Sequence, residues 1–373
     1  MAIITKEWKG TEYFPITELD HVEFYAGNAK QAVHYYRTVF GFKPYAYAGP
    51  ETGRRDAVSY VLKQNKIFFV ITTPLNSSHP ATDWLKTHGD GVCDVAFKAD
   101  SAKEAYESCL SRDAKSAYDF TEISDENGTF RKAAIKTYGD TIHSFIERKD
   151  YNGLWAPGYE KLEMGPVSFE DPGLILMDHI VGNVDDGKMD TWKEYYERVF
   201  GLTNFIVFDE GDISTKFSAL KSRVMRSKNW KVLFPINEPA KGLKKSQIEE
   251  YLEFNEGPGV QHIALLTSDI IKTITALRKN GVEFLYVPDT YYDDILDRVG
   301  PIDEALAPLK ELGILIDRDD EGYLLQLFTK PVEDRPTLFY EIIQRKGSRG
   351  FGQGNFQALF ESIESEQERR GNL

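Results

Sequence analysis

Three residues of the second half carry the side chains that a redox-active metal ion needs, namely His179, His262 and Glu341. Two histidines and one carboxylate can occupy one face of an octahedron and leave three positions open, which is the ligand set of non-haem iron(II) oxygenases. The three residues lie far apart in the chain, so only tertiary folding can unite them. We therefore expect one Fe(II) ion per chain at this triad.

The pattern around each candidate ligand predicts a strand. His179 stands in LMDHIVGNV and His262 in GVQHIALL, both at the start of an apolar run. Glu341 stands in TLFYEIIQR, where Phe339 and Ile343 share its face because side chains alternate along a strand. A carboxylate on an otherwise apolar face is costly unless it has a partner, which favours a metal ligand over an ordinary charged residue.

An internal repeat organises the chain into two homologous halves. Residues 20–41 and 178–201 both open on Asp-His and close on Val-Phe-Gly. The similarity continues with GVCDVAF and GVQHIAL, and then with IHSFIERK and FYEIIQRK. Such self-similarity indicates a duplicated fold.

The repeat also allows the two halves to be compared at the candidate ligands. His21 aligns with His179, but Asp94 takes the place of His262, and Ser144 that of Glu341. We therefore expect that the first half cannot hold iron in the same way. Its expected role is structural, in oligomerisation or in shielding the second half.

The elements that must position the ligands repeat in the order strand, helix and three further strands. The helix expected at 29–40 has Asn28 as N-cap and Gly41 as stop, and its counterpart ends at Gly201. The fold class expected is α+β, with two such βαβββ modules in each half. A segment rich in Pro and Gly predicts a linker at 156–171, between domains at 1–155 and 172–373.

Composition narrows the classes of partner. Lys and Arg number 45 against 59 Asp and Glu, and the net charge of −14 repels nucleic acid and anionic lipid. No apolar run approaches the roughly 18 residues of a membrane span, and no secretory signal is visible. Two cysteines exclude a disulfide framework. We expect a cytoplasmic homo-oligomer, dimer or tetramer, that binds small molecules and neither nucleic acid nor membrane.

Several long blocks of the sequence resemble the 4-hydroxyphenylpyruvate dioxygenase family. They include MDHIVGNV, EGYLLQLFTKPVEDRPTLFYEIIQR and GFGQGNFQALF. The resemblance implies vicinal-oxygen-chelate domains, whose modules curl into a cup around the metal. It also implies conversion of 4-hydroxyphenylpyruvate and dioxygen to homogentisate and carbon dioxide, a step in tyrosine and phenylalanine catabolism.

The same resemblance implies a set of pocket residues around the iron ligands. The expected catalytic polar groups are Ser222, Asn237, Gln247, Gln261 and Gln326. The expected substrate-binding residues are Phe328, Phe339, Phe351, Phe356 and Asn355. Gln side chains donate and accept hydrogen bonds without charge, which suits the orientation of a keto acid or phenol in a dry pocket.

The glycines of GFGQGNF resemble a phosphate loop, but the dinucleotide pattern requires an acidic residue on a following strand, and the chain ends in a charged helix. We interpret the glycines as a hinge and Asn355 as a helix cap. A helix at about 355–370 then carries an apolar stripe that begins at Phe356 and Leu359. It is expected to act as a lid that excludes water from the reaction.

Three alternatives remain open. A 4-hydroxymandelate synthase would use the same metal and substrate but oxidise the benzylic carbon, and Phe328 favours ring attack in the family pattern. An extradiol ring-cleaving dioxygenase would act on catechols with a similar triad. A non-catalytic binding module would fail to bind Fe(II).

Overall fold

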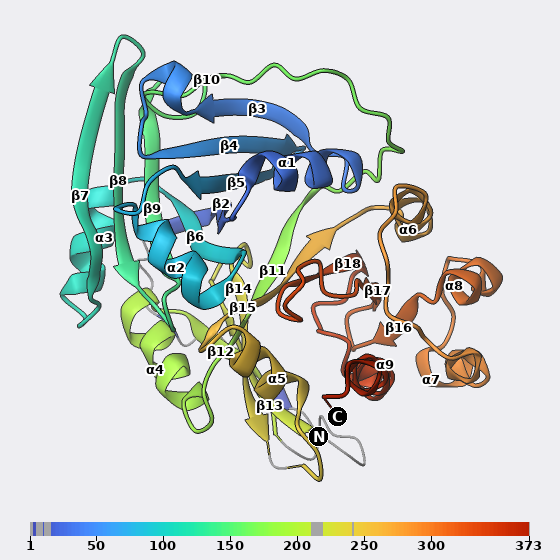
Figure 1. Cartoon of the computed structure of the whole chain (residues 1–373). Helices are drawn as coiled ribbons and strands as arrows, with labels where there is room; N and C mark the ends of the chain where they lie inside the picture. The colour runs from blue at the N-terminus through green and yellow to red at the C-terminus, as the bar shows by residue number, and fades with distance from the viewer. Residues whose placement is uncertain (1–2, 5–9, 11–15, 210–218, 241, 373) are drawn as a thin grey trace.

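The computed structural model describes residues 3–4, 10, 16–209, 219–240 and 242–372. These residues form two curled, mixed β-sheets with helices packed along them (Figure 1). No helix in this part of the chain is long and apolar enough to cross a membrane. The predicted α+β class is confirmed.

The first sheet contains two βαβββ modules. The first module consists of β2 (Ile16–Tyr25), α1 (Ala29–Thr38), β3 (Lys43–Ala48), β4 (Ala57–Gln64) and β5 (Ile67–Pro74). The second consists of β6 (Gly91–Ala99), α3 (Ala102–Leu110), β7 (Ser116–Asp125), β8 (Gly128–Lys136) and β9 (Ile142–Tyr151). Helix α2 (Pro80–His88) connects them.

The second sheet repeats this plan. Its first module consists of β11 (Leu176–Asn183), α4 (Met189–Phe200), β12 (Thr203–Phe208), β13 (Ala219–Arg226) and β14 (Leu233–Ala240). Its second consists of β15 (Gly259–Leu266), α6 (Ile270–Lys279), β16 (Leu315–Arg318), β17 (Tyr323–Phe328) and β18 (Phe339–Lys346). The added helices are α5 (Gln247–Phe254), α7 (Ile295–Val299), α8 (Leu306–Leu312) and α9 (Phe356–Arg370).

The strand order is equivalent in the two sheets. The first runs β10-β3-β4-β5-β2-β6-β9-β8-β7, and the second runs β1-β12-β13-β14-β11-β15-β18-β17-β16. In each module the first strand pairs in parallel with the last, and the first strands of the two modules meet antiparallel in the middle. The predicted duplication therefore places β11, β15 and β18 side by side.

Two short strands connect segments outside the modules to the sheets. Strand β1 (Ile3–Ile4), at the start of the chain, pairs with β12 of the second sheet. Strand β10 (Glu160–Lys161), inside the predicted linker, pairs with β3 of the first sheet. The limits 1–155, 156–171 and 172–373 themselves stay a prediction.

The helix ends follow the sequence signals closely. The Asn28 side chain accepts a hydrogen bond from the backbone N–H of Gln31 at 3.2 Å, so the predicted N-cap of α1 is confirmed. Helix α1 ends at Thr38, two residues before the predicted end. Helix α4 ends at Phe200, and the predicted stop Gly201 caps it with a φ of 63°, the left-handed conformation that glycine adopts at helix ends.

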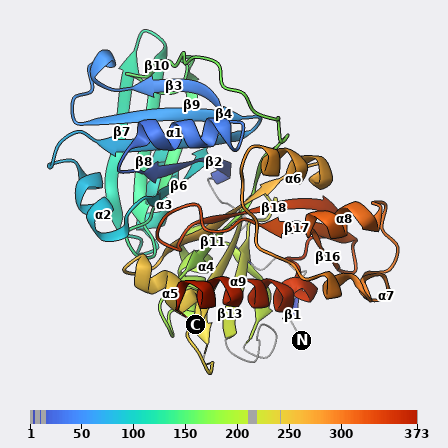
Figure 2. The same cartoon turned by 45° about the vertical axis from the view of Figure 1, so that its right-hand side comes forward.

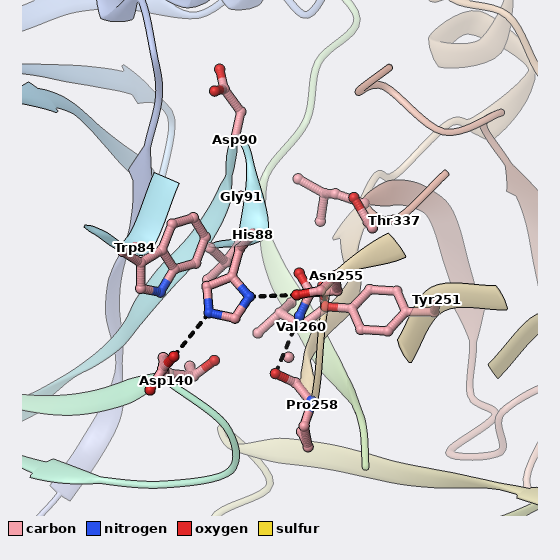
Figure 3. Close-up of a pocket in the computed structure, with 14 residues that line it drawn as sticks. Trp84, His88, Asp90, Gly91, Asp140, Tyr251, Asn255, Pro258, Val260 and Thr337 are labelled. Atoms are coloured by element: carbon pink, nitrogen blue, oxygen red, sulfur yellow. Dashed lines mark hydrogen bonds and ion pairs between the residues drawn. The ribbon is translucent and has the colours of Figure 1, made fainter. Parts of the chain in front are cut away.

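The two halves pack against each other through one continuous hydrophobic core. The Tyr340 hydroxyl of β18 donates a hydrogen bond to Tyr36 of α1 at 2.8 Å. In a separate contact, His88 lies between the Asp140 carboxylate, at 3.0 Å, and the backbone carbonyl of Asn255, at 2.5 Å (Figure 3). The bonds from Tyr340 to Tyr36 and from His88 to Asn255 are buried and hold the first half beside the second.

Candidate metal centre

The second sheet brings His179, His262 and Glu341 together. They lie on the adjacent strands β11, β15 and β18, and Ala264 of β15 is opposite both His179 and Glu341 in the ladders. The Oε2 atom of Glu341 is 3.0 Å from Nε2 of His179 and 3.4 Å from Nε2 of His262. One ligand atom from each residue lies within 4.8 Å of the others.

The triad is buried, and its charges are strongly coupled. Burial raises the pKa of Glu341, but the adjacent His179 cation and the hydrogen bonds from the two histidines lower it to about 2. Burial lowers the pKa of His179, whereas Glu341 and Asp178 raise it to about 9. A positive charge is therefore favoured beside Glu341, and a bound metal cation would replace the proton on His179.

A second set of residues orients the ligands. The Nδ1 atom of His179 lies 2.8 Å from the Asp178 carboxylate, which Arg345 holds with two hydrogen bonds of 2.8 and 2.7 Å. The Nδ1 atom of His262 lies 3.0 Å from the amide oxygen of Gln261. Because each Nδ1–H has an acceptor, each Nε2 lone pair is free to bind a metal.

A largely apolar pocket surrounds the triad. Eight of the ten predicted pocket residues line it: Ser222, Asn237, Gln247, Gln261, Phe328, Phe339, Phe351 and Phe356. Phe339 stacks on the His262 ring at 4.8 Å, and Phe351 lies edge-on to the His179 ring at 4.9 Å. Aromatic walls with a few uncharged polar groups suit an aromatic small molecule.

Gln326 is placed outside this lining. It is buried on β17, and neither its amide oxygen nor its amide nitrogen has a hydrogen-bond partner. The side chain packs tightly on the backbone of Gly352, whose φ is 75°. Strand alternation correctly put Gln326 on the face of Phe328, but it could not show that the loop at 350–354 would cover it. The catalytic role of Gln326 stays a prediction.

Asn355 occupies the predicted N-cap position of α9, but it does not cap the helix with its side chain. Its amide oxygen instead accepts hydrogen bonds from the Tyr291 hydroxyl at 2.6 Å and from Arg298 at 3.4 Å. The residue is buried outside the pocket lining, so its predicted contact with substrate has no support from its position.

The predicted apolar stripe of the C-terminal helix faces the pocket. Helix α9 runs across the second sheet (Figure 2), and Phe356, Leu359 and Phe360 line the pocket. The end of the helix is held to α5, where Arg370 donates hydrogen bonds to Glu250 at 3.2 and 2.7 Å. The helix therefore covers the metal centre in this structure.

Sequence reasoning missed Asn183. Strand pairing places Ser222, Asn237 and Asn183 in one row across β13, β14 and β11, on the same face of the sheet. Asn183 is fully buried, and neither polar atom of its side chain has a partner. The signal was available, because Asn183 follows His179 by four residues on the same strand face.

The comparisons with known proteins cover both halves. A family model described as "Hydroxyphenylpyruvate dioxygenase, HPPD, N-terminal" matches residues 13–159. A second, the "Glyoxalase/Bleomycin resistance protein/Dioxygenase superfamily", matches residues 176–327. Both are similar to the corresponding half along most of its length.

Relatives named 4-hydroxyphenylpyruvate dioxygenase are similar along nearly the whole chain. The protein of Aspergillus fumigatus is 49% identical, over 95% of this chain and 93% of its own. That of Dictyostelium discoideum is 46% identical, over 95% and 99%. A solved mutant of 4-hydroxymandelate synthase from Streptomyces coelicolor superposes with a TM-score of 0.85 at 30% identity, over 95% and 99%.

Proposed function

The chain belongs to the 4-hydroxyphenylpyruvate dioxygenase family, and from that premise we propose that it works through iron(II) bound by His179, His262 and Glu341. It is an oxidoreductase that converts 4-hydroxyphenylpyruvate and dioxygen to homogentisate and carbon dioxide. The observation that carries the iron assignment is the convergence of three buried ligand atoms within 4.8 Å in an aromatic pocket.

The residues of the triad fit iron(II). Two imidazole nitrogens and one carboxylate supply a mixed nitrogen and oxygen set, and they leave the pocket side open. When bound there, the ion supplies open coordination positions at which a keto acid and dioxygen can be activated. Asp178 and Gln261 keep the two imidazoles in the required tautomer.

The polar groups of the pocket divide it into two ends. Gln261 contacts His262 at the metal end, where the keto acid group of the substrate is expected. Ser222 and Asn237 mark the other end, on β13 and β14, which lie on the far side of β11 from β15 and β18. We place the phenol hydroxyl at that end, where these uncharged groups can donate and accept hydrogen bonds without a buried charge.

The aromatic walls hold the ring of the substrate. Phe328 is opposite Glu341 in the β17–β18 ladder and edge-on to His262, with ring centroids 6.0 Å apart. A large ring at this place restricts how the substrate can turn above the metal. It supports attack on the ring rather than on the benzylic carbon, which is the 4-hydroxymandelate synthase alternative.

Helix α9 completes the site by excluding water. Its residues Phe356, Leu359 and Phe360 close the pocket with apolar side chains. A closed, dry pocket strengthens electrostatic interactions and protects reactive intermediates from side reactions. The helix would have to move for substrate entry, as lids do in many enzymes.

The decisive experiment is product analysis with defined metal loading. Metal-free protein is reconstituted with Fe(II), supplied with 4-hydroxyphenylpyruvate and ¹⁸O₂, and analysed by mass spectrometry. We expect homogentisate with one labelled atom in the carboxylate and one in the new hydroxyl. Hydroxymandelate would support the synthase, and a ring-opened yellow product from a catechol would support the extradiol alternative.

The iron ligands are tested separately by substitution. Glu341→Ala is expected to abolish both Fe(II) binding and product formation, because the remaining histidines supply only two ligands. His34→Gln, on the exposed face of α1, is the matched control and should leave both unchanged. Full activity in the Glu341→Ala variant would contradict the assignment.

We further propose that the chain forms a dimer or tetramer and works in the cytoplasm. Both cysteines, Cys93 and Cys109, are free and buried, which is compatible with a reducing compartment. Light scattering of the purified chain tests the assembly, and cell fractionation tests the location.

A further inference from the structure

The first half contains a second group of metal-ligand side chains. His21 and Glu23 on β2 and Asp94 on β6 each place one ligand atom within 4.8 Å of the others. We propose that these residues bind a divalent first-row transition-metal cation, so that the chain holds two metal ions. The proposal goes beyond the proposed function, because none of the three residues lines the catalytic pocket.

The internal repeat explains how this group arises. Glu23 is opposite Asp94 in the β2–β6 ladder, just as Val181 is opposite His262 in the β11–β15 ladder. Glu23 therefore occupies the position of Val181. Ser144 replaces Glu341, so one carboxylate is missing from that position, but Glu23 supplies another on the central strand β2. A comparison of the three ligand positions alone does not reveal this replacement.

The support of the histidine is the same in both halves. The Nδ1 atom of His21 lies 2.7 Å from Asp20, which accepts a hydrogen bond from Arg148 at 2.5 Å. This repeats the arrangement of His179, Asp178 and Arg345. In metalloproteins such a carboxylate fixes the imidazole so that Nε2 faces the ion. The first half thus retains the orienting residues of a metal histidine.

The two carboxylates are also held in place. The Thr72 hydroxyl donates a hydrogen bond to Glu23 at 2.5 Å. The backbone N–H of Ser144 donates to Asp94 at 3.0 Å, and the Ser144 hydroxyl donates to the other oxygen of the same carboxylate. These bonds use only part of the acceptor capacity of each carboxylate. The remaining lone pairs can bind a cation.

Charge supplies the reason for a divalent ion. His21 and Asp94 are buried, and Glu23 is partly buried. Two carboxylates within 4.8 Å repel each other strongly when they are shielded from water. One divalent cation neutralises both. A ligand set of one nitrogen and two carboxylates suits Mn²⁺, Fe²⁺, Co²⁺ or Zn²⁺.

The surroundings indicate a structural ion rather than a second catalytic one. The Tyr118 hydroxyl lies 2.5 Å from the Ser144 hydroxyl, which in turn binds Asp94. Tyr118 thus stands in front of the position that corresponds to Glu341 in the second half. The ion would tie β2 to β6 at the centre of the first sheet, where it would stabilise the folded half.

The first test is metal stoichiometry, with Mn²⁺ as the probe. Full-length chains are stripped of metal, dialysed to equilibrium against Mn²⁺ under argon, and measured by mass spectrometry and by electron paramagnetic resonance. We expect two ions in the wild-type chain, one in Glu341→Ala, and none in Glu341→Ala combined with Asp94→Asn. The control Asp100→Asn, at the exposed residue that directly follows β6, should lose no ion.

One ion in the wild-type chain and none in Glu341→Ala would overturn the proposal. Glu23→Gln provides a second, equally conservative variant in case Asp94→Asn does not fold. Addition of Mn²⁺ should also raise the melting temperature of Glu341→Ala, because a ligand of the folded state stabilises it, but not that of the double variant. Homogentisate formation by the wild-type chain tests the proposed function independently, so the two failures can be distinguished.

Discussion

Asp178 shows how much the metal centre depends on a residue that does not bind the metal. It is buried between His179 and Arg345, and burial raises its pKa while Arg345 and His179 bring that pKa far below the usual range. It is therefore a permanent anion that holds the Nδ1 proton of His179. The same arrangement occurs at Asp20 and His21 in the first half, where Arg148 takes the place of Arg345.

Asp178→Asn tests the role of Asp178 in orienting His179, because the two side chains have nearly the same shape. The amide loses the negative charge, so we expect the Fe(II) affinity of the catalytic site to fall by about 10- to 100-fold, as for other residues that orient metal ligands. Competition titration with a chelator measures the affinity, and Asp171→Asn in the exposed linker is the control. An unchanged affinity would show that Asp178 serves only the fold.

Phe328 controls what the bound substrate can present to the metal. Phe328→Leu removes the ring beside His262 and Glu341, so we expect the product to shift from homogentisate towards 4-hydroxymandelate, with a fall in kcat. Chromatography of the products measures the ratio. Homogentisate as the sole product would mean that other walls of the pocket fix the substrate.

Among the elements, α9 is held to α5 by a charged pair in its last turn. The Glu250 side chain is almost fully buried, and Arg370 reaches it with two hydrogen bonds from the last turn of the helix. Charged hydrogen bonds of this kind contribute roughly 1.5–3 kcal/mol. The closed state of the lid should therefore depend on Arg370.

Arg370→Ala is expected to raise KM roughly tenfold and to increase the dioxygen consumed per homogentisate formed, because water enters a looser pocket. An oxygen electrode combined with product analysis measures both. Arg369→Ala is the matched control, since Arg369 is mostly exposed and pairs with Glu366 on the same helix. Equal effects of the two variants would contradict a specific role of the Arg370–Glu250 pair in keeping α9 closed.

The elements were largely predictable because their signals are local. The repeat, strand alternation and helix ends predicted all four βαβββ modules, and three strand positions were enough to locate the triad. The predictions that failed concern contacts between residues far apart in the sequence. The partner of Asn355 is Tyr291, and Gln326 is covered by the loop around Gly352, which no spacing rule reveals. Glu23 was missed because the comparison of the halves considered only the known ligand positions.

For the molecule as a whole, the contact between the halves contains a histidine that must stay neutral. His143 of β9 donates to the Val95 carbonyl at 2.9 Å and accepts a hydrogen bond from the Tyr196 hydroxyl at 2.7 Å. It stacks on Phe234 of the second half. Burial lowers its pKa from the ordinary 6.5 to about 4. The first half therefore contacts the second through His143, a side chain that becomes positively charged in acid.

This predicts an acid-sensitive fold. Below pH 6.5 the unfolded chain protonates His143 while the folded chain does not, so stability is complete above pH 6.5 and falls as the pH drops towards 4. The full decrease in the free energy of unfolding is about 3 kcal/mol. Urea unfolding at pH 7.5 and 4.5 should show a smaller loss in His143→Gln than in the wild type. Equal losses would mean that His143 is not held neutral.

The iron site is tested most directly by the anaerobic addition of 4-hydroxyphenylpyruvate to Fe(II)-loaded protein, followed by air. We expect a metal-to-ligand charge-transfer band that is absent from the Glu341→Ala variant, and homogentisate as the product once air is admitted. A wild-type protein that gives neither the band nor homogentisate would contradict the assignment of an iron dioxygenase site to His179, His262 and Glu341.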